Sequence, residues 1–344
     1  MEPWYLKLLH TGLVPDSLVR PVLFWITRRK IRGLERLSLE NQETRRRSLL
    51  DKFRSSEIAL EPELPNLQHY EVPPAFFQQV LGKRMKYSCC LWTGEADTLD
   101  QAEDAMLDLT CRRAGLEDGM DVLDLGCGWG SLTFWIAERY PRCRILAVSN
   151  SRDQVEWIRT RAARAGLDNV QAKVSDVNHL ELGQDFDRVF SVEMFEHMKN
   201  YPRLLRLIAD HLKPGGKLFV HLFSHRHFTY EYQARDRDNW MAQTFFTGGT
   251  MPADDLLLHF QEDVFLEDHW RLSGRHYAKT LRAWLNKMDR HRAAVRDILA
   301  GAYGRGQVQR WWINWRLFFL ACEATWAWRG GREYLVSQYL FRKR

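Results

Sequence analysis

Short apolar runs alternate with segments of helical periodicity through the middle of the chain. The apolar runs are typical of buried strands, and the spacing in the intervening segments is typical of amphipathic helices. Strands that alternate with helices predict a mostly parallel sheet covered by helices on both faces, an α/β fold. The predicted strands are 120–125, 144–148, 170–174, 188–192 and 217–223, and the predicted helices are 98–116, 132–140, 154–165 and 201–212.

Three parts are predicted along the chain. Residues 1–65 form a helical N-terminal extension that contains a basic cluster at 28–32, and a linker with two prolines follows at 61–66. We interpret the extension as a lid packed on the main domain, or as an interfacial helix that contacts anionic lipid. Residues 66–225 form the α/β core with preceding covering helices, and 226–344 form a helical, aromatic cap that completes the core.

The composition is that of a globular protein with a large core. The chain has 344 residues, of which 45% are hydrophobic and 12% aromatic, and this excludes fibrous and disordered classes. The net charge of +6 suits an anionic ligand, a lipid surface or nucleic acid and decides among none of them. Because no basic-aromatic stripe accompanies the charge, no nucleic-acid partner is expected.

Neither a disulfide framework nor a metal site is indicated. The six cysteines form no Cys-x-x-Cys pair and no zinc-type spacing. His225 and His227 lack a surrounding ligand set and are predicted to lie in a loop. The N-terminus has no signal-peptide pattern, and polar residues interrupt the apolar stretch 311–328, which therefore fails as a membrane span. A cytoplasmic compartment is expected.

A glycine-rich turn follows the first predicted strand. Its string is Asp124-Leu-Gly126-Cys-Gly128-Trp-Gly130, and a doubly wound sheet binds its nucleotide-type ligand at this place. The glycines permit positive φ and close approach of the backbone, and the next helix directs its N-terminus at the ligand. The string alone is weak evidence, but its position between a strand and a helix strengthens it.

The ends of the second and third strands discriminate between cofactors. Dinucleotide enzymes usually have an acid after the second strand, whereas this chain has Ser149, Asn150 and Gln154. Asp176 and Val177 follow the third strand, where the carboxylate can meet an adenine amine. These features together resemble a class I S-adenosylmethionine-dependent methyltransferase with a Rossmann-like sheet.

Three titratable residues follow the fourth strand and therefore lie beside the methyl donor. Glu193 and Glu196 are three residues apart and can share one face of a turn, with His197 adjacent. Such a group can hold a cationic substrate or remove a proton from it. A helix start with favourable acids is the simpler alternative.

Tryptophans gather in the segment 311–328. Two interpretations stay open: an amphipathic core helix, or an aromatic wall that surrounds a cation or a planar ring. Arg316 and Glu323 are seven residues apart, which places both on nearly one face of the helix as a polar stripe.

Longer strings narrow the resemblance to one superfamily. It contains cyclopropane fatty acid synthases, mycolic acid methyltransferases and coclaurine-type N-methyltransferases, and from about residue 8 onward the chain most resembles the coclaurine N-methyltransferase branch. The strings that carry the resemblance are Gly12-Leu-Val-Pro15-Asp16, Lys86-Tyr87-Ser88-Cys89-Cys90, Glu193-Met-Phe-Glu196-His197-Met-Lys-Asn-Tyr201, Phe245-Phe-Thr-Gly-Gly-Thr-Met-Pro252 and His276-Tyr277-Ala-Lys-Thr280.

The resemblance implies roles for individual residues. S-adenosylmethionine would be the methyl donor and S-adenosylhomocysteine the product, and Glu193, Glu196 and His197 would form the catalytic acid–base group. The donor site would be lined by Tyr87, Ser88, Asp124, Gly126, Gly128, Gly130, Ser149, Asn150, Gln154, Asp176 and Val177. Cyclopropane synthases hold bicarbonate with residues that match Cys89, Glu196, His221 and Tyr277 and the backbone at Phe223, so bicarbonate binding is left open. Trp326 is a further candidate for contact with the substrate.

One position separates the branches. Cyclopropane synthases resemble Gly-x-Phe-Glu-His here, whereas this chain has Glu193 in place of the glycine. A carboxylate there repels an anion and favours an ammonium. We therefore expect an N-methyltransferase that acts on a small cyclic or aromatic amine, with bicarbonate-assisted lipid C-methylation as the alternative. Peripheral lipid contact and a homodimer are left open.

Overall fold

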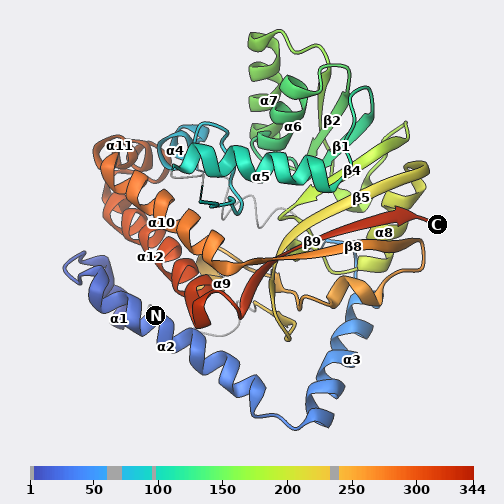
Figure 1. The fold of residues 1–344 in the computed structure, drawn as a ribbon. Coiled ribbons are helices and arrows are strands. Elements are labelled where there is room, and N and C mark those ends of the chain that lie inside the picture. Colours follow the sequence, from blue (N-terminus) through green and yellow to red (C-terminus); the bar gives the residue numbers. More distant parts are fainter. Residues whose placement is uncertain (1–3, 60–71, 95–97, 233–239) are drawn as a thin grey trace.

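A seven-stranded sheet forms the centre of the computed structural model, which describes residues 4–59, 72–94, 98–232 and 240–344 (Figure 1). Its strands are β1 (Asp121–Leu125), β2 (Arg144–Ser149), β3 (Val170–Val174), β4 (Phe186–Val192), β5 (Leu212–His225), β8 (Val264–Ser273) and β9 (Tyr334–Lys343). The order is β3-β2-β1-β4-β5-β9-β8. β1 to β5 are parallel, and β9 runs antiparallel to both neighbours. The predicted mostly parallel sheet is confirmed.

Two strands of this sheet, β8 and β9, were not among the predicted ones. Both come from the C-terminal part, where the sequence shows mainly helical periods. The first eight residues of β9 are buried on both faces, so the strand lacks the alternation that identifies a half-exposed strand. Ser337 and Gln338 also interrupt its apolar run. A second, two-stranded sheet pairs β6 (Tyr230–Glu231) with β7 (Thr250–Met251).

Helices cover both faces of the sheet, as expected for a doubly wound fold. Side chains of Val122 and Ile145 pack on one face with α5, α6 and α7, whereas Leu123 and Leu146 pack on the other face with α3 and α8. These helices are α3 (Leu39–Ser55), α5 (Leu99–Arg113), α6 (Ser131–Arg139), α7 (Arg152–Ala165) and α8 (Tyr201–Asp210). α5 begins at a capping box, in which Thr98 and Gln101 satisfy each other's backbone N–H groups.

A further group of helices lies to one side of the sheet (Figure 1). It consists of α1 (Trp4–His10), α2 (Asp16–Glu35), α4 (Pro74–Val80), α10 (Gly274–Arg290), α11 (Arg292–Tyr303) and α12 (Val308–Ala327), and α9 (Trp240–Thr244) is a short additional helix. No helix in the described ranges is both long and apolar enough to cross a membrane.

The polar stripe predicted on the tryptophan-rich helix is confirmed. Arg316 of α12 pairs with Asp16 of α2 at 2.7 Å and with Asp289 of α10. Glu323, seven residues further along α12, pairs with Arg20 of α2 at 3.1 Å and with Arg282 of α10. The stripe therefore holds α2 and α10 against α12. Trp312 and Trp315 of the same helix are buried in the core.

One local prediction was wrong. His225 is not in a loop but is the last residue of β5, where it is fully buried. Its Nδ1 accepts hydrogen bonds from the backbone N–H groups of His227 and Phe228, so the ring closes the turn after the strand. The three-part division of the chain stays a prediction, because the boundary at 65/66 and the linker 61–66 lie outside the described residues.

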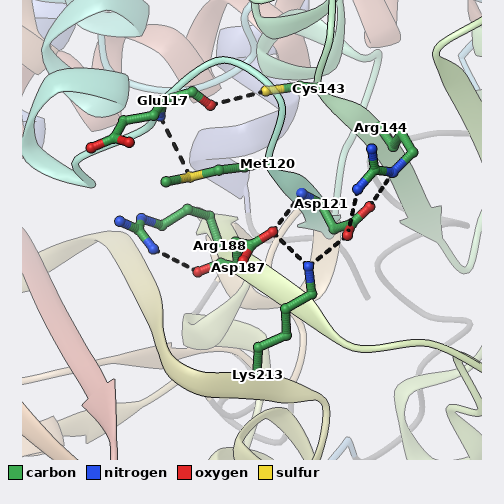
Figure 2. A network of polar contacts seen from close by, with 8 residues as sticks. All are labelled: Glu117, Met120, Asp121, Cys143, Arg144, Asp187, Arg188 and Lys213. Atoms are coloured by element: carbon green, nitrogen blue, oxygen red, sulfur yellow. Dashed lines mark hydrogen bonds and ion pairs between the residues drawn. The ribbon is translucent and has the colours of Figure 1, made fainter.

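Charged side chains connect the amino ends of four neighbouring strands (Figure 2). Lys213 of β5 donates to Asp121 of β1 at 2.6 Å and to Asp187 of β4 at 2.8 Å. Arg144 of β2 donates to Asp121 at 2.6 Å, and the backbone N–H of Asp121 donates to Asp187. Each carboxylate in this network has at least one cationic partner.

Candidate active site

The glycine-rich turn lies at the carboxyl end of β1, opposite the charge network. Gly126, Gly128 and Gly130 all have positive φ, between 53° and 82°. A Cβ on Gly126 would lie 2.7 Å from Met194, whereas a Cβ on Gly128 would point into open space. Only glycine adopts this run of conformations at little cost, and the backbone at Gly128 is accessible to a ligand.

The residues that follow β2 form a buried hydrogen-bonded group. Ser149 Oγ donates to Gln154 Oε1 at 2.7 Å and accepts from the backbone N–H of Ser151. Gln154 Nε2 is buried and has no hydrogen-bond partner among the described residues. A buried amide donor without an acceptor is costly, so this side fits a ligand that supplies an acceptor.

Two aspartates lie at the ends of β1 and β3. Asp124 is buried and accepts from Thr133 Oγ1 at 2.7 Å, and burial raises its pKa to about 6. Asp176 accepts from the backbone N–H of Asn178 and begins the short 3-10 helix Val177–His179. The structure thus brings the predicted donor-site residues of three strands to one edge of the sheet, with Asn150 directly after β2.

Glu193 directly follows β4 and is the best-connected acid at this edge. Its Oε1 accepts from the backbone N–H of Cys89 at 2.9 Å, and its Oε2 accepts from the Tyr277 hydroxyl at 2.6 Å. Its φ is +51°, a left-handed conformation that costs a non-glycine residue roughly 1–3 kcal/mol. Although burial favours the neutral acid, the neighbouring His221 and the charge of Lys86 hold the pKa of Glu193 below its ordinary value.

His221 of β5 faces Glu193 in a defined tautomer. Its Nε2 lies 3.5 Å from Glu193 Oε1, and its Nδ1 lies 2.9 Å from Gln338 Nε2. The amide orientation of Gln338 is fixed because its Oε1 accepts from Arg113 at 2.5 Å. Since an amide nitrogen can only donate, Nδ1 of His221 accepts and the ring proton lies on Nε2, toward Glu193.

Glu196 is buried in a different way from Glu193. Neither of its carboxyl oxygens has a hydrogen-bond partner among the described residues. Burial, together with the nearby charge of Glu193, raises the pKa of Glu196 well above its ordinary value. Burial and the charge of Lys199 lower the pKa of His197 to about 4. These shifts favour the anion at Glu193, the neutral acid at Glu196 and the neutral imidazole at His197.

These three residues lie at one side of a cavity of about 690 Å³. Tyr87, Phe223, Tyr277 and Trp326 also line it, together with apolar side chains of α1 and α2. Trp326 lies 4.7 Å from Tyr277 and 5.4 Å from Phe223, measured between ring centroids. The arrangement can hold a cation between carboxyl groups and aromatic faces. Ser88 and Cys89 are buried behind this wall.

Comparison with known proteins assigns the chain to a family. Residues 62–329 match the family model described as mycolic acid cyclopropane synthetase. The chain belongs to this family. (S)-coclaurine N-methyltransferase of Thalictrum flavum subsp. glaucum is 36% identical over 343 residues, which are 98% of this chain and 95% of the relative. A crystal structure of coclaurine N-methyltransferase bound to N-methylheliamine and SAH superposes with a TM-score of 0.94 at 36% identity, covering 98% of this chain and 99% of that one.

The likeness to lipid-modifying relatives is more restricted. Cyclopropane-fatty-acyl-phospholipid synthase of Escherichia coli (strain K12) is 32% identical over 222 residues, which are 64% of this chain and 55% of the synthase. The N-methyltransferases match almost end to end. The chain is an S-adenosylmethionine-dependent methyltransferase with the fold expected from its sequence.

Sequence reasoning missed two residues of this methyltransferase that contact the site indirectly. Gln338 comes from β9, which was not predicted, and Arg113 comes from the end of α5. Neither residue belongs to the sequence strings on which the family resemblance rests. A buried glutamine in the middle of an apolar run is the signal that could have identified Gln338.

Proposed function

We propose that this methyltransferase transfers a methyl group to the nitrogen of a small cyclic or aromatic amine. The observation that carries the proposal is the cavity in which Glu193 and Glu196 meet aromatic walls. Its volume of about 690 Å³ suits a molecule of a few rings. The relatives' names agree, since one acts on coclaurine and a solved one binds N-methylheliamine.

The carboxyl ends of β1, β2 and β3 fit the methyl donor. The amide nitrogen of Gln154, which has no partner among the described residues, supplies a hydrogen-bond donor, and the carboxylate of Asp176 supplies an acceptor. The backbone at Gly128 leaves room for the ligand. Tyr87 lines the substrate cavity and Ser88 is buried next to it in the chain, and both would cover the bound donor. When bound, S-adenosylmethionine supplies an electrophilic methyl group on a positively charged sulfur. Holding the acceptor in line with that group supplies much of the rate.

Glu196 acts as the proton acceptor in this proposal. A protonated amine has no lone pair, so it must lose its proton before it can form a new N–C bond. An incoming ammonium offsets the burial that keeps Glu196 neutral, so the carboxyl group releases its own proton to water as the cation enters the cavity. The proton then passes from nitrogen to Glu196, and the electron pair stays on nitrogen. Because its raised pKa makes the Glu196 carboxylate a stronger base, this transfer is favourable.

Glu193 and His197 have separate roles. Glu193 stays ionised and stabilises positive charge as it develops on nitrogen. His197 stays neutral, so its ring can accept a hydrogen bond from the amine without adding a positive charge.

The position of Glu193 also argues against the lipid alternative. Its carboxylate already takes up the Cys89 N–H and the Tyr277 hydroxyl and lies beside His221. These are three of the groups that the resemblance assigns to bicarbonate. A second anion at this place, such as bicarbonate, would be repelled by Glu193. The amine reaction does not need bicarbonate, because the side chain of Glu196 serves as its base.

Methyl-labelled S-adenosylmethionine separates the alternatives. The enzyme is incubated with tetrahydroisoquinoline-type amines and, in parallel, with phospholipid vesicles. We expect label in the amine and none in the lipid. Labelled lipid without labelled amine would reverse the assignment, and binding of the donor with no turnover on either substrate would contradict an enzymatic role.

We further infer that α2 contacts an anionic lipid surface. Leu18, Val22 and Trp25 are exposed on α2 and line the mouth of the cavity, and Arg28 and Arg29 are exposed beside them. An apolar face next to arginines matches the charge of an anionic bilayer. Flotation with anionic but not zwitterionic vesicles, lost in Arg28→Glu/Arg29→Glu, is expected. A doubled mass in light scattering with no flotation would favour the homodimer instead.

A further inference from the structure

The segment 82–92 crosses between α5 and α10 without forming a helix or strand. Its backbone N–H groups therefore need partners elsewhere. Glu103 of α5, which is fully buried, accepts from Gly82, Arg84 and Lys86 at 3.0, 2.8 and 3.2 Å. On the other side, His276 and Thr280 of α10 accept from the backbone of Trp92 and Cys90. The two helices together fix the path of the segment.

Lys86 lies within this segment and has no place in the mechanism described so far. Its side chain is buried, at 1% exposure, and its ammonium donates to Cys89 O at 2.7 Å and to Ser88 Oγ. Among the described residues it forms no ion pair within 4 Å. A buried, unpaired ammonium is costly, which argues for a function of its charge.

We propose that Lys86 is a positioning residue, whose buried ammonium aims the Cys89 N–H at Glu193 and keeps Glu193 ionised. The path is short: Lys86 holds the carbonyl of Cys89, and the N–H of the same residue donates to Glu193 at 2.9 Å. The inference rests on the proposed role of Glu193 in amine methylation.

Lys86 is the lysine whose charge lowers the pKa of Glu193, and a charge on His221 acts in the same direction. The titratable groups that interact with Glu193 are Cys89, Cys90, Glu196, His197, His221, Tyr277 and Cys322. Burial lowers the pKa of both histidines and thereby disfavours their cationic forms. Lys86 lowers the pKa of Glu193, and the carboxyl group of Glu103 fixes the backbone of Lys86 from the opposite side. Removing the ammonium should therefore raise the pKa of Glu193.

Carbon-13 NMR of protein labelled at the glutamate δ-carbon tests this without turnover. The signal of Glu193 is assigned by its loss in Glu193→Gln, and its titration is compared in the wild type, Lys86→Met and Lys83→Met. Lys83 is the matched control because it lies in the same segment but is exposed. We expect the Glu193 midpoint to move upward by at least about one pH unit in Lys86→Met and to stay unchanged in Lys83→Met.

Activity adds a second measurement. In Lys86→Met, the acid limb of the kcat–pH profile should move upward together with the Glu193 midpoint, so kcat falls at pH values near that midpoint and recovers as the pH is raised and Glu193 ionises. Lys86→Gln, which keeps a hydrogen-bond donor, should show the same shift if charge is decisive. An unshifted Glu193 midpoint, or an equal loss of kcat at every pH, would overturn the inference. Absence of amine turnover in the wild type would instead contradict the proposed function and leave the NMR comparison intact.

Discussion

Two groups of acidic residues lie at opposite ends of the same strands and are treated differently. At the amino ends, Asp121 and Asp187 pair with Lys213 and Arg144 near the surface (Figure 2). At the carboxyl ends, Glu196 is buried and the side chain of Glu193 is 8% exposed, and neither has a lysine or arginine within ion-pair distance among the described residues. Surface pairs contribute about 0–1 kcal/mol each, whereas an uncompensated buried charge costs several kcal/mol.

The difference indicates which acidic residues would be stabilised by a cation that a bound substrate supplies. The amino-end network is neutralised by the chain itself, so it needs nothing else. The carboxyl-end acids face a cavity, and a protonated amine would supply the missing charge. The following variants break this contrast, from the largest expected effect to the smallest.

Replacing Glu196 should have the largest effect. Glu196→Gln keeps the size of the side chain but removes the proton acceptor, so kcat should fall by about 10²- to 10⁴-fold. Steady-state kinetics with a saturating amine measure this. Glu156→Gln, an exposed position on α7, is the control and should match the wild type. A Glu196→Gln enzyme within twofold of the wild type would exclude Glu196 as the base.

Glu193→Gly should separate activity from stability. Loss of the carboxylate should lower kcat/KM by about 10²-fold, because positive charge on nitrogen is no longer stabilised. The melting temperature should change little, because glycine relieves the positive φ while the Cys89 N–H and the Tyr277 hydroxyl lose their acceptor. Calorimetry beside the kinetic assay checks both. Unchanged amine turnover would undercut the role of Glu193, and a gain of lipid methylation would show that the site reverts to the alternative reaction.

Gln338→Met tests the indirect contact through His221. The variant keeps an apolar side chain of similar length but no longer donates to His221 Nδ1, so the ring can turn or change tautomer. We expect kcat/KM to fall about tenfold, the value of one hydrogen bond. The pH profile should change with it. A stable variant with an unaltered profile would show that the tautomer of His221 is irrelevant.

Asp121→Asn should leave activity unchanged and cost less than about 1 kcal/mol of stability. Hydrogen bonding from Arg144 and Lys213 lowers the pKa of Asp121 relative to the unfolded chain. A group with a lowered pKa stabilises the fold above its unfolded value of about 4, and this contribution is lost progressively as the pH falls from there through the lower folded pKa. Urea unfolding should therefore show a larger difference from the wild type at pH 7 than at pH 3. A fall in kcat would contradict the contrast between the two ends.

Sequence patterns predicted those parts of the fold that are formed by residues close together in the chain. The five parallel strands, the glycine turn and the Glu193–His197 string could be read from the sequence because each is continuous in the chain. β8, β9, Arg113 and Gln338 could not, because their places depend on pairing between segments far apart. The opposite protonation of Glu193 and Glu196 was also beyond the sequence, since it arises from burial and from the donors that only Glu193 receives.

Difference infrared spectroscopy of carboxyl groups tests the central claim most directly. At neutral pH the enzyme without substrate should show the C=O band of a protonated carboxylic acid. That band should be weaker in Glu196→Gln, where the contribution of Glu103 remains because burial raises the pKa of Glu103 to about 7. It should persist at full strength in Glu193→Gln and diminish when an amine substrate binds. An unchanged band in Glu196→Gln, or one that disappears in Glu193→Gln, would contradict the assignment of Glu196 as the neutral acid that ionises when the amine binds.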